Sequence, residues 1–93
     1  MFNVIISTVE KKVLGEFLVD SYFFEPSKYN YAFYLFKDGK KIDTVGYSSN
    51  MKVDFDIKGM NGIFYIRAYI KDVVHKNIRA YNSDKLSIDS WEI

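Results

Sequence analysis

The side chains best suited to catalysis are few in this chain and lie apart from one another. It contains no cysteine and a single histidine, His75, which stands between Val74 and Lys76 in a segment expected to be a turn. A catalytic or metal-binding histidine needs a second ligand or an activated nucleophile beside it, and the sequence identifies neither. We therefore interpret His75 as an exposed turn residue and expect the protein not to be an enzyme.

The aspartates occur in two settings, neither of them typical of a reactive site. Asp54 and Asp56 alternate along one strand and are flanked by Lys52 and Lys58, which is typical of a solvated charged face. Three others stand at expected turn positions: Asp38, Asp72 and Asp84. An aspartate in a turn accepts hydrogen bonds from its own backbone, whereas calcium needs a denser cluster of oxygens. We expect no metal ion and no cofactor.

Aromatic side chains are the more distinctive feature, with eight Tyr, eight Phe and one Trp in 93 residues. Two alternating runs, 29–37 and 63–71, bury one set of apolar side chains if both are strands, and side chains two apart share a face. In a sandwich these runs are expected to be neighbours, so the alternate set forms one continuous strip facing solvent. The candidate binding residues are Tyr34, Phe36, Tyr65, Arg67 and Tyr69.

Three interpretations of this strip remain open. Cross-strand aromatic pairs stabilise sheets, and these side chains need have no other role. Exposed aromatics also anchor a protein partner or an adjacent domain, and they stack on sugar rings. A change of register by one residue would turn the whole strip inward. Trp91, near the end of the chain, is either docked on the domain or exposed for a neighbour.

The elements that position the strip are short strands joined by turns. The clearest strand covers residues 51–57, where four apolar residues alternate with charged ones. The segment 37–40 contains Asp-Gly, a strong hairpin signal. The return strand, 41–47, is polar and rich enough in lysine to be an edge strand.

The remaining strands are marked by breaks in the pattern. The first two are expected within residues 2–24, with a break near 10–12 or at Gly15, and a loop at 25–28 holds the only proline. The last strand is expected near 78–83. Turn signals thus recur at a spacing of roughly 8–12 residues without helical periodicity. The sequence predicts an all-β fold, a seven-stranded antiparallel immunoglobulin-like β-sandwich.

Length and charge restrict the class of protein further. The chain is long enough for one domain spanning 1–93, and its hydrophobic content of 48% supplies a core. A net charge of +1 gives no steering toward nucleic acid. No stretch approaches the ~20 apolar residues of a membrane helix, so we expect neither a nucleic-acid partner nor membrane insertion.

Residues 16–83 resemble a known class of module. The run 31–42, the strand at 51–57 and the run 62–72 follow one another as an aromatic strand entering a Lys-Asp-Gly-Lys hairpin, an alternating strand and a final aromatic strand. This order is similar to the bacterial immunoglobulin-like and fibronectin type III-like modules that include the triple-tyrosine motif domains. The chain departs from that class at Phe64, where a tyrosine is frequent.

The resemblance implies a function as well as a fold. Such modules are usually non-catalytic accessory units of larger surface or polysaccharide-related proteins. It therefore implies an interaction or scaffolding role, with adjacent domains or a protein as partner. Residues 84–93 lie outside the resembling segment and are expected to be a tail or the start of a linker, although their weak alternation from residue 86 onward could also extend the last strand. The alternative is a carbohydrate-binding module that holds an oligosaccharide on the aromatic strip.

Overall fold

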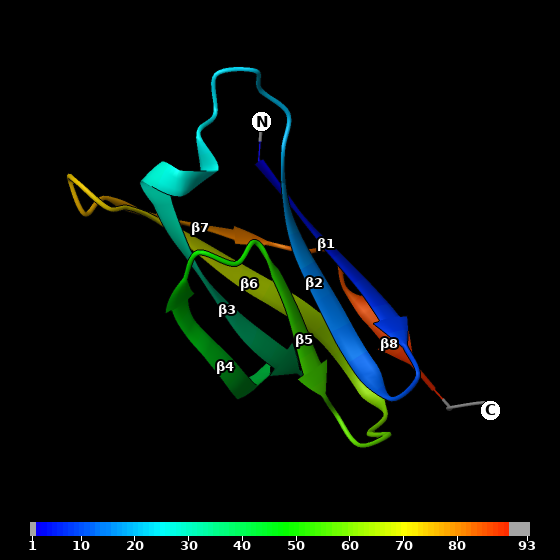
Figure 1. The fold of residues 1–93 in the computed structure, drawn as a ribbon. Coiled ribbons are helices and arrows are strands. Elements are labelled where there is room, and N and C mark those ends of the chain that lie inside the picture. Colours follow the sequence, from blue (N-terminus) through cyan, green and yellow to red (C-terminus); the bar gives the residue numbers. More distant parts are fainter. Residues whose placement is uncertain (1, 90–93) are drawn as a thin grey trace.

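The computed structural model describes residues 2–89, which form two antiparallel β-sheets packed face to face (Figure 1). The strands are β1 (Phe2–Val9), β2 (Lys12–Val19), β3 (Tyr29–Lys37), β4 (Lys40–Ser48), β5 (Lys52–Asp56), β6 (Gly62–Asp72), β7 (Ile78–Asn82) and β8 (Leu86–Ile88). A single 3-10 turn, Pro26–Lys28, precedes β3. Across these described residues there is no α-helix, and hence no helix able to cross a membrane.

The two sheets differ in size and are linked by repeated crossings. The smaller sheet has the order β1-β2-β5, and the larger has the order β4-β3-β6-β7, with β8 also paired to β6. The chain passes from one sheet to the other after β2, after β4 and after β5. Every pairing is antiparallel. The described residues thus confirm an all-β, two-sheet antiparallel sandwich.

The strand count is eight, so the predicted count of seven was wrong. The additional strand, β8, lies in the segment interpreted as a tail. It forms because β6 extends from Gly62 to Asp72, whereas β7 pairs only with its second half, from Arg67 to Lys71. The first half of that edge of β6 would keep unpaired backbone groups, and β8 pairs with them. Three residues are too few to show a periodic signal.

The two aromatic runs adopt the predicted register. β3 and β6 are neighbours, with Phe33 opposite Ala68 and Leu35 opposite Ile66. These four side chains are at most 1% exposed, and they belong to the core between the sheets. The alternate side chains of both strands therefore face outward. The structure thereby settles the choice of register that the sequence left open, with Phe33, Leu35 and Ile66 in the core.

The break between the first two strands falls at Glu10 and Lys11, and Gly15 lies inside β2. Glycine at this position lets the two sheets approach closely. A Cβ atom on Gly15 would lie 2.6 Å from Cδ1 of Ile66 in the facing sheet and 3.0 Å from Cγ1 of Val53. Ile66 is fully buried, so it has no free space into which to move.

Candidate functional site

The five predicted site residues lie together on the outer surface of the larger sheet. Tyr34 is directly opposite Arg67, and Phe36 is directly opposite Tyr65. The rings of Phe36 and Tyr65 are stacked, with centroids 4.6 Å apart and planes 2° from parallel. The rings of Tyr34 and Tyr69 meet at 4.8 Å with a tilt of 58°. All five side chains are half-buried, because each covers part of its neighbour.

Cations cover part of the ring surfaces that the aromatic pairs leave open. The Arg67 guanidinium lies over the Phe36 ring, 5.1 Å from its centroid. Its Nε atom donates a hydrogen bond of 2.9 Å to Oδ1 of Asn82 on β7, which fixes its position. The Lys41 ammonium lies 4.6 Å from the centroid of Tyr34. Such cation–π contacts are worth about 0.5–1 kcal/mol at exposed sites.

Three residues of this surface were missed by the sequence reasoning: Lys41, Tyr47 and Lys71. The Lys71 ammonium lies 4.2 Å from the centroid of the Tyr47 ring. Burial raises the pKa of the Tyr47 hydroxyl, with smaller contributions from Tyr34 and Tyr69. β4 was interpreted as a polar edge strand, which it is, but the β3–β4 pairing contains two irregularities. Tyr47 lies past one of them and inside the other, and a bulge of this kind changes the face to which later side chains point. Lys41 lies opposite Phe36 directly after the turn, so the register of the Asp-Gly hairpin could have placed it on this face.

We call this surface the aromatic face. It comprises Tyr34, Phe36, Lys41, Tyr47, Tyr65, Arg67, Tyr69 and Lys71. None of the residues that the strand pairing places on the outer side of the larger sheet is acidic. Within the described part of the chain, its three cations form no ion pair. The face is therefore positively charged, although the whole chain is nearly neutral.

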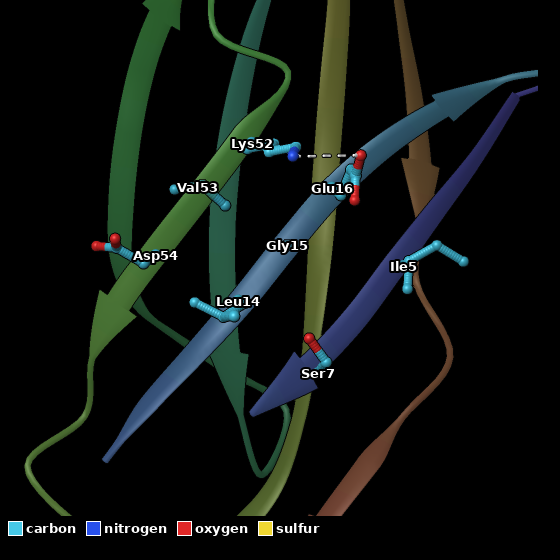
Figure 2. Close-up of a pocket in the computed structure, with 8 residues that line it drawn as sticks. All are labelled: Ile5, Ser7, Leu14, Gly15, Glu16, Lys52, Val53 and Asp54. Carbon is cyan, nitrogen blue, oxygen red and sulfur yellow. Dashed lines mark ion pairs between the residues drawn. The ribbon is translucent and has the colours of Figure 1, made fainter. Parts of the chain in front are cut away.

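A concave feature lies elsewhere, on the outer surface of the smaller sheet. It is a shallow groove of about 340 Å³. Figure 2 shows side chains of β1, β2 and β5 around it, with the Glu16 and Asp54 carboxylates directed apart. Glu16 lies 3.9 Å from Nζ of Lys52, and both side chains are well exposed. Ser7 is the one hydroxyl among the lining residues, and none of them is a histidine that could activate it.

The single histidine, His75, lies in the turn between β6 and β7. The Asp72 carboxylate accepts backbone hydrogen bonds from Val74 at 2.8 Å and from His75 at 2.9 Å. These two bonds, together with the nearby His75 ring, lower the pKa of Asp72. The His75 side chain is 73% exposed and lies 3.5 Å from this carboxylate. The pair stabilises the turn. Asp72 also lines an open groove of about 270 Å³ beside Tyr29 and Arg79, whereas His75 does not line it.

Several other residues singled out by the sequence lie outside the aromatic face. Asp54 and Asp56 lie exposed on the outer side of β5. Residues 2–89 include no group of three His, Cys, Asp or Glu side chains placed to hold a metal ion. Trp91 lies outside the described residues. Comparison of the chain with family models, with curated protein sequences and with solved structures finds no match.

Proposed function

We propose that this domain is a non-catalytic interaction module of the immunoglobulin-like, fibronectin type III-like kind, an accessory unit of a larger bacterial surface or polysaccharide-related protein. Its support in the fold is the pair of antiparallel sheets with Greek-key crossings between them, an architecture those modules share. Because such sandwiches carry many unrelated functions, the proposal depends on the surface and not on the fold alone.

The aromatic face is the surface we assign to binding. Lys41, Arg67 and Lys71 lie over rings of the aromatic face and have no carboxylate partner on the same face. Aromatic and arginine side chains are the residues that most often anchor a protein interface. An excess of one charge favours a partner with the opposite charge. We therefore expect an acidic protein surface, on an adjacent domain or on a separate protein.

The ring geometry gives less support to the carbohydrate alternative. A sugar stacks on a flat ring surface, and near-coplanar exposed rings would provide one. Here Phe36 is stacked against Tyr65 and also contacts Arg67, while Tyr34 contacts Tyr69 and Lys41. The rings are arranged to pack on one another and on cations. An oligosaccharide is accordingly an outcome for the experiment to distinguish.

The test is a titration of the isolated domain in which the amide chemical shifts are recorded by NMR at each step. Three probes are added separately: a glutamate-rich peptide, an oligosaccharide of uronic acids and a neutral oligosaccharide. We expect saturable shifts with the peptide, concentrated on β3, β4 and β6 around Tyr34, Tyr65 and Lys71. Shifts with the neutral sugar alone would support the carbohydrate alternative. No saturable shift on this face with any probe would contradict both.

A further inference from the structure

We propose that the free edge of β1 pairs with β1 of a second copy of this chain, antiparallel and with Ile5 opposite the partner's Ile5. The resulting contact joins the two smaller sheets into one continuous sheet. It uses a different surface from the aromatic face and does not depend on the function proposed above. This pairing is supported by the direction of the backbone groups of β1, by the lack of charged side chains on that strand and by its self-complementary sequence.

The backbone direction follows from the hydrogen bonds on the other side of β2. The Phe17 N–H donates to the Met51 carbonyl at 2.8 Å, and the Ile57 N–H donates to the Lys11 carbonyl at 3.2 Å. The odd-numbered residues of β2 therefore direct their backbone groups toward β5, and the even-numbered ones direct theirs toward β1. Glu16 is paired with Ile5, so the odd-numbered residues of β1 face β2.

The even-numbered residues of β1 consequently direct their N–H and C=O groups to the open edge. They are Phe2, Val4, Ile6 and Thr8. Among the described residues, β1 pairs with β2 alone, and β1 forms one border of the smaller sheet (Figure 1). An edge of this kind is a template for a further strand, because its backbone groups have no partner within the sheet.

This edge lacks the protection that the other long edges have. β1 contains no charged residue, no proline and no glycine over its eight residues. By contrast, β4 carries Lys40, Lys41 and Asp43, and β5 carries Lys52 together with two aspartates. β7 carries Arg79. Charged side chains on an edge oppose association with another strand, so β1 is the long edge left open to it.

The sequence of β1 suits a second copy of itself. With Ile5 at the two-fold axis, Val4 lies opposite the partner's Ile6, and Asn3 lies opposite the partner's Ser7. Apolar residues thus meet on the inner side, and polar residues meet on the outer side beside Ile5. The Ile5 side chain, which is 46% exposed and lies at one end of the groove in Figure 2, would be covered by its symmetry mate.

The first test is sedimentation equilibrium of the domain across a range of concentrations. We expect a reversible dimer for the wild type, and monomers for both Ile5→Lys and Ile5→Glu because like charges would meet at the axis. An equimolar mixture of these two variants should dimerise again. The control is Leu18→Lys. It adds the same charge to the outer face of the smaller sheet, but on β2 and away from the two-fold axis, so it should leave the dimer intact.

The second test fixes the register by crosslinking. The chain has no cysteine, so Ile5→Cys and Ser7→Cys each introduce a single thiol. Directly opposite residues of a pair without hydrogen bonds lie close enough for a disulfide. With diamide as oxidant, Ile5→Cys should form a covalent dimer, whereas Ser7→Cys should not, because the two Ser7 positions lie four residues apart across the pair.

The two tests distinguish the proposed dimer from a monomer and from a dimer with another interface. A wild-type domain that stays monomeric at millimolar concentration would overturn the proposal. A dimer that survives Ile5→Lys and Ile5→Glu, or that crosslinks equally through both cysteines, would show a different interface. Either result leaves the aromatic face and its titration unaffected.

Discussion

Phe36 and Tyr65 stack face to face across β3 and β6, with ring centroids 4.6 Å apart and planes 2° from parallel. The two residues are directly opposite in the strand pairing, so the stack is the side-chain counterpart of the backbone register. It also positions the surface, because the Arg67 guanidinium lies over the Phe36 ring. The proposed interaction surface is thus built on the same contacts that hold the larger sheet together.

A double-mutant cycle measures this contact directly. Phe36→Leu and Tyr65→Leu each remove one ring and keep an apolar side chain. The coupling in the free energy of unfolding should be about 0.5–1.5 kcal/mol, the usual value for an aromatic pair. Chemical denaturation of the four proteins gives this quantity. Additive effects would mean that the stack contributes nothing to stability.

Gly15 sets the distance between the two sheets. Gly15→Ala places a methyl group 2.6 Å from Cδ1 of the buried Ile66, so we expect destabilisation by about 1–3 kcal/mol, the usual cost of overpacking. The control is Gly46→Ala in β4, where a Cβ atom meets nothing within 4 Å. That variant should stay within about 1 kcal/mol of the wild type. Equal losses in the two variants, measured by urea unfolding, would contradict the role assigned to Gly15.

A buried hydroxyl group ties the start of β3 to the preceding turn. The Tyr31 hydroxyl donates a hydrogen bond of 3.1 Å to the Pro26 carbonyl, and burial raises the pKa of this phenol. Tyr31→Phe should lower the free energy of unfolding by about 1 kcal/mol. Tyr22→Phe removes a hydroxyl from a fully exposed side chain and serves as the control. Thermal unfolding of both variants checks the difference.

Protonation of the Asp38 carboxylate at acid pH should lower the stability of the fold. Its carboxylate accepts a hydrogen bond of 3.0 Å from the Ile63 N–H and lies 2.9 Å from Nζ of Lys37, and these contacts lower its pKa. A carboxyl group whose pKa is lowered by folding stabilises the protein above its unfolded pKa of about 3.9. That contribution is lost as the pH falls through the folded value.

The matched variant is Asp38→Asn, because Asn-Gly also suits the turn, where residue 38 has φ 50°. It should lose less stability than the wild type when the pH is lowered from neutral to about 2, a range that spans the unfolded carboxyl pKa. Asp54→Asn makes the same charge change at an exposed strand position and is the comparison. Unfolding curves that stay parallel to those of the wild type at every pH would exclude this role for Asp38.

The sequence predicted most of the larger sheet because its strands have one buried side. In β3 and β6 the interior polar residues Asn30 and Arg67 both fall in the outward alternate set, and the opposite set, which includes Phe33, Leu35 and Ile66, is buried. The five predicted site residues came from the same alternation, and the structure places all five on one surface. The Asp-Gly sequence also predicted the hairpin turn correctly, because Asp38 and Gly39 both adopt the positive φ that such a turn requires.

The sequence did not predict what depends on distant contacts. β8 forms because half of one edge of β6 would otherwise be unpaired, which requires knowing how far β7 extends. Tyr47 joins the aromatic face past one irregularity in the β3–β4 pairing and inside the other. The contact between Lys71 and Tyr47 links two strands that are not neighbours. None of these contacts can be predicted from the alternation of apolar and polar residues within a single strand.

The most direct test of the proposed function is the affinity of the glutamate-rich peptide for a variant with a neutralised aromatic face. Lys41→Gln combined with Lys71→Gln keeps the rings and removes two of the three cations. If each exposed charge contributes about 0.7 kcal/mol to the binding free energy, the loss of both should raise the Kd for the peptide by about 10-fold. Lys52→Gln, on the opposite sheet, should bind as the wild type does. If both variants bind equally well, the aromatic face is not the interaction surface.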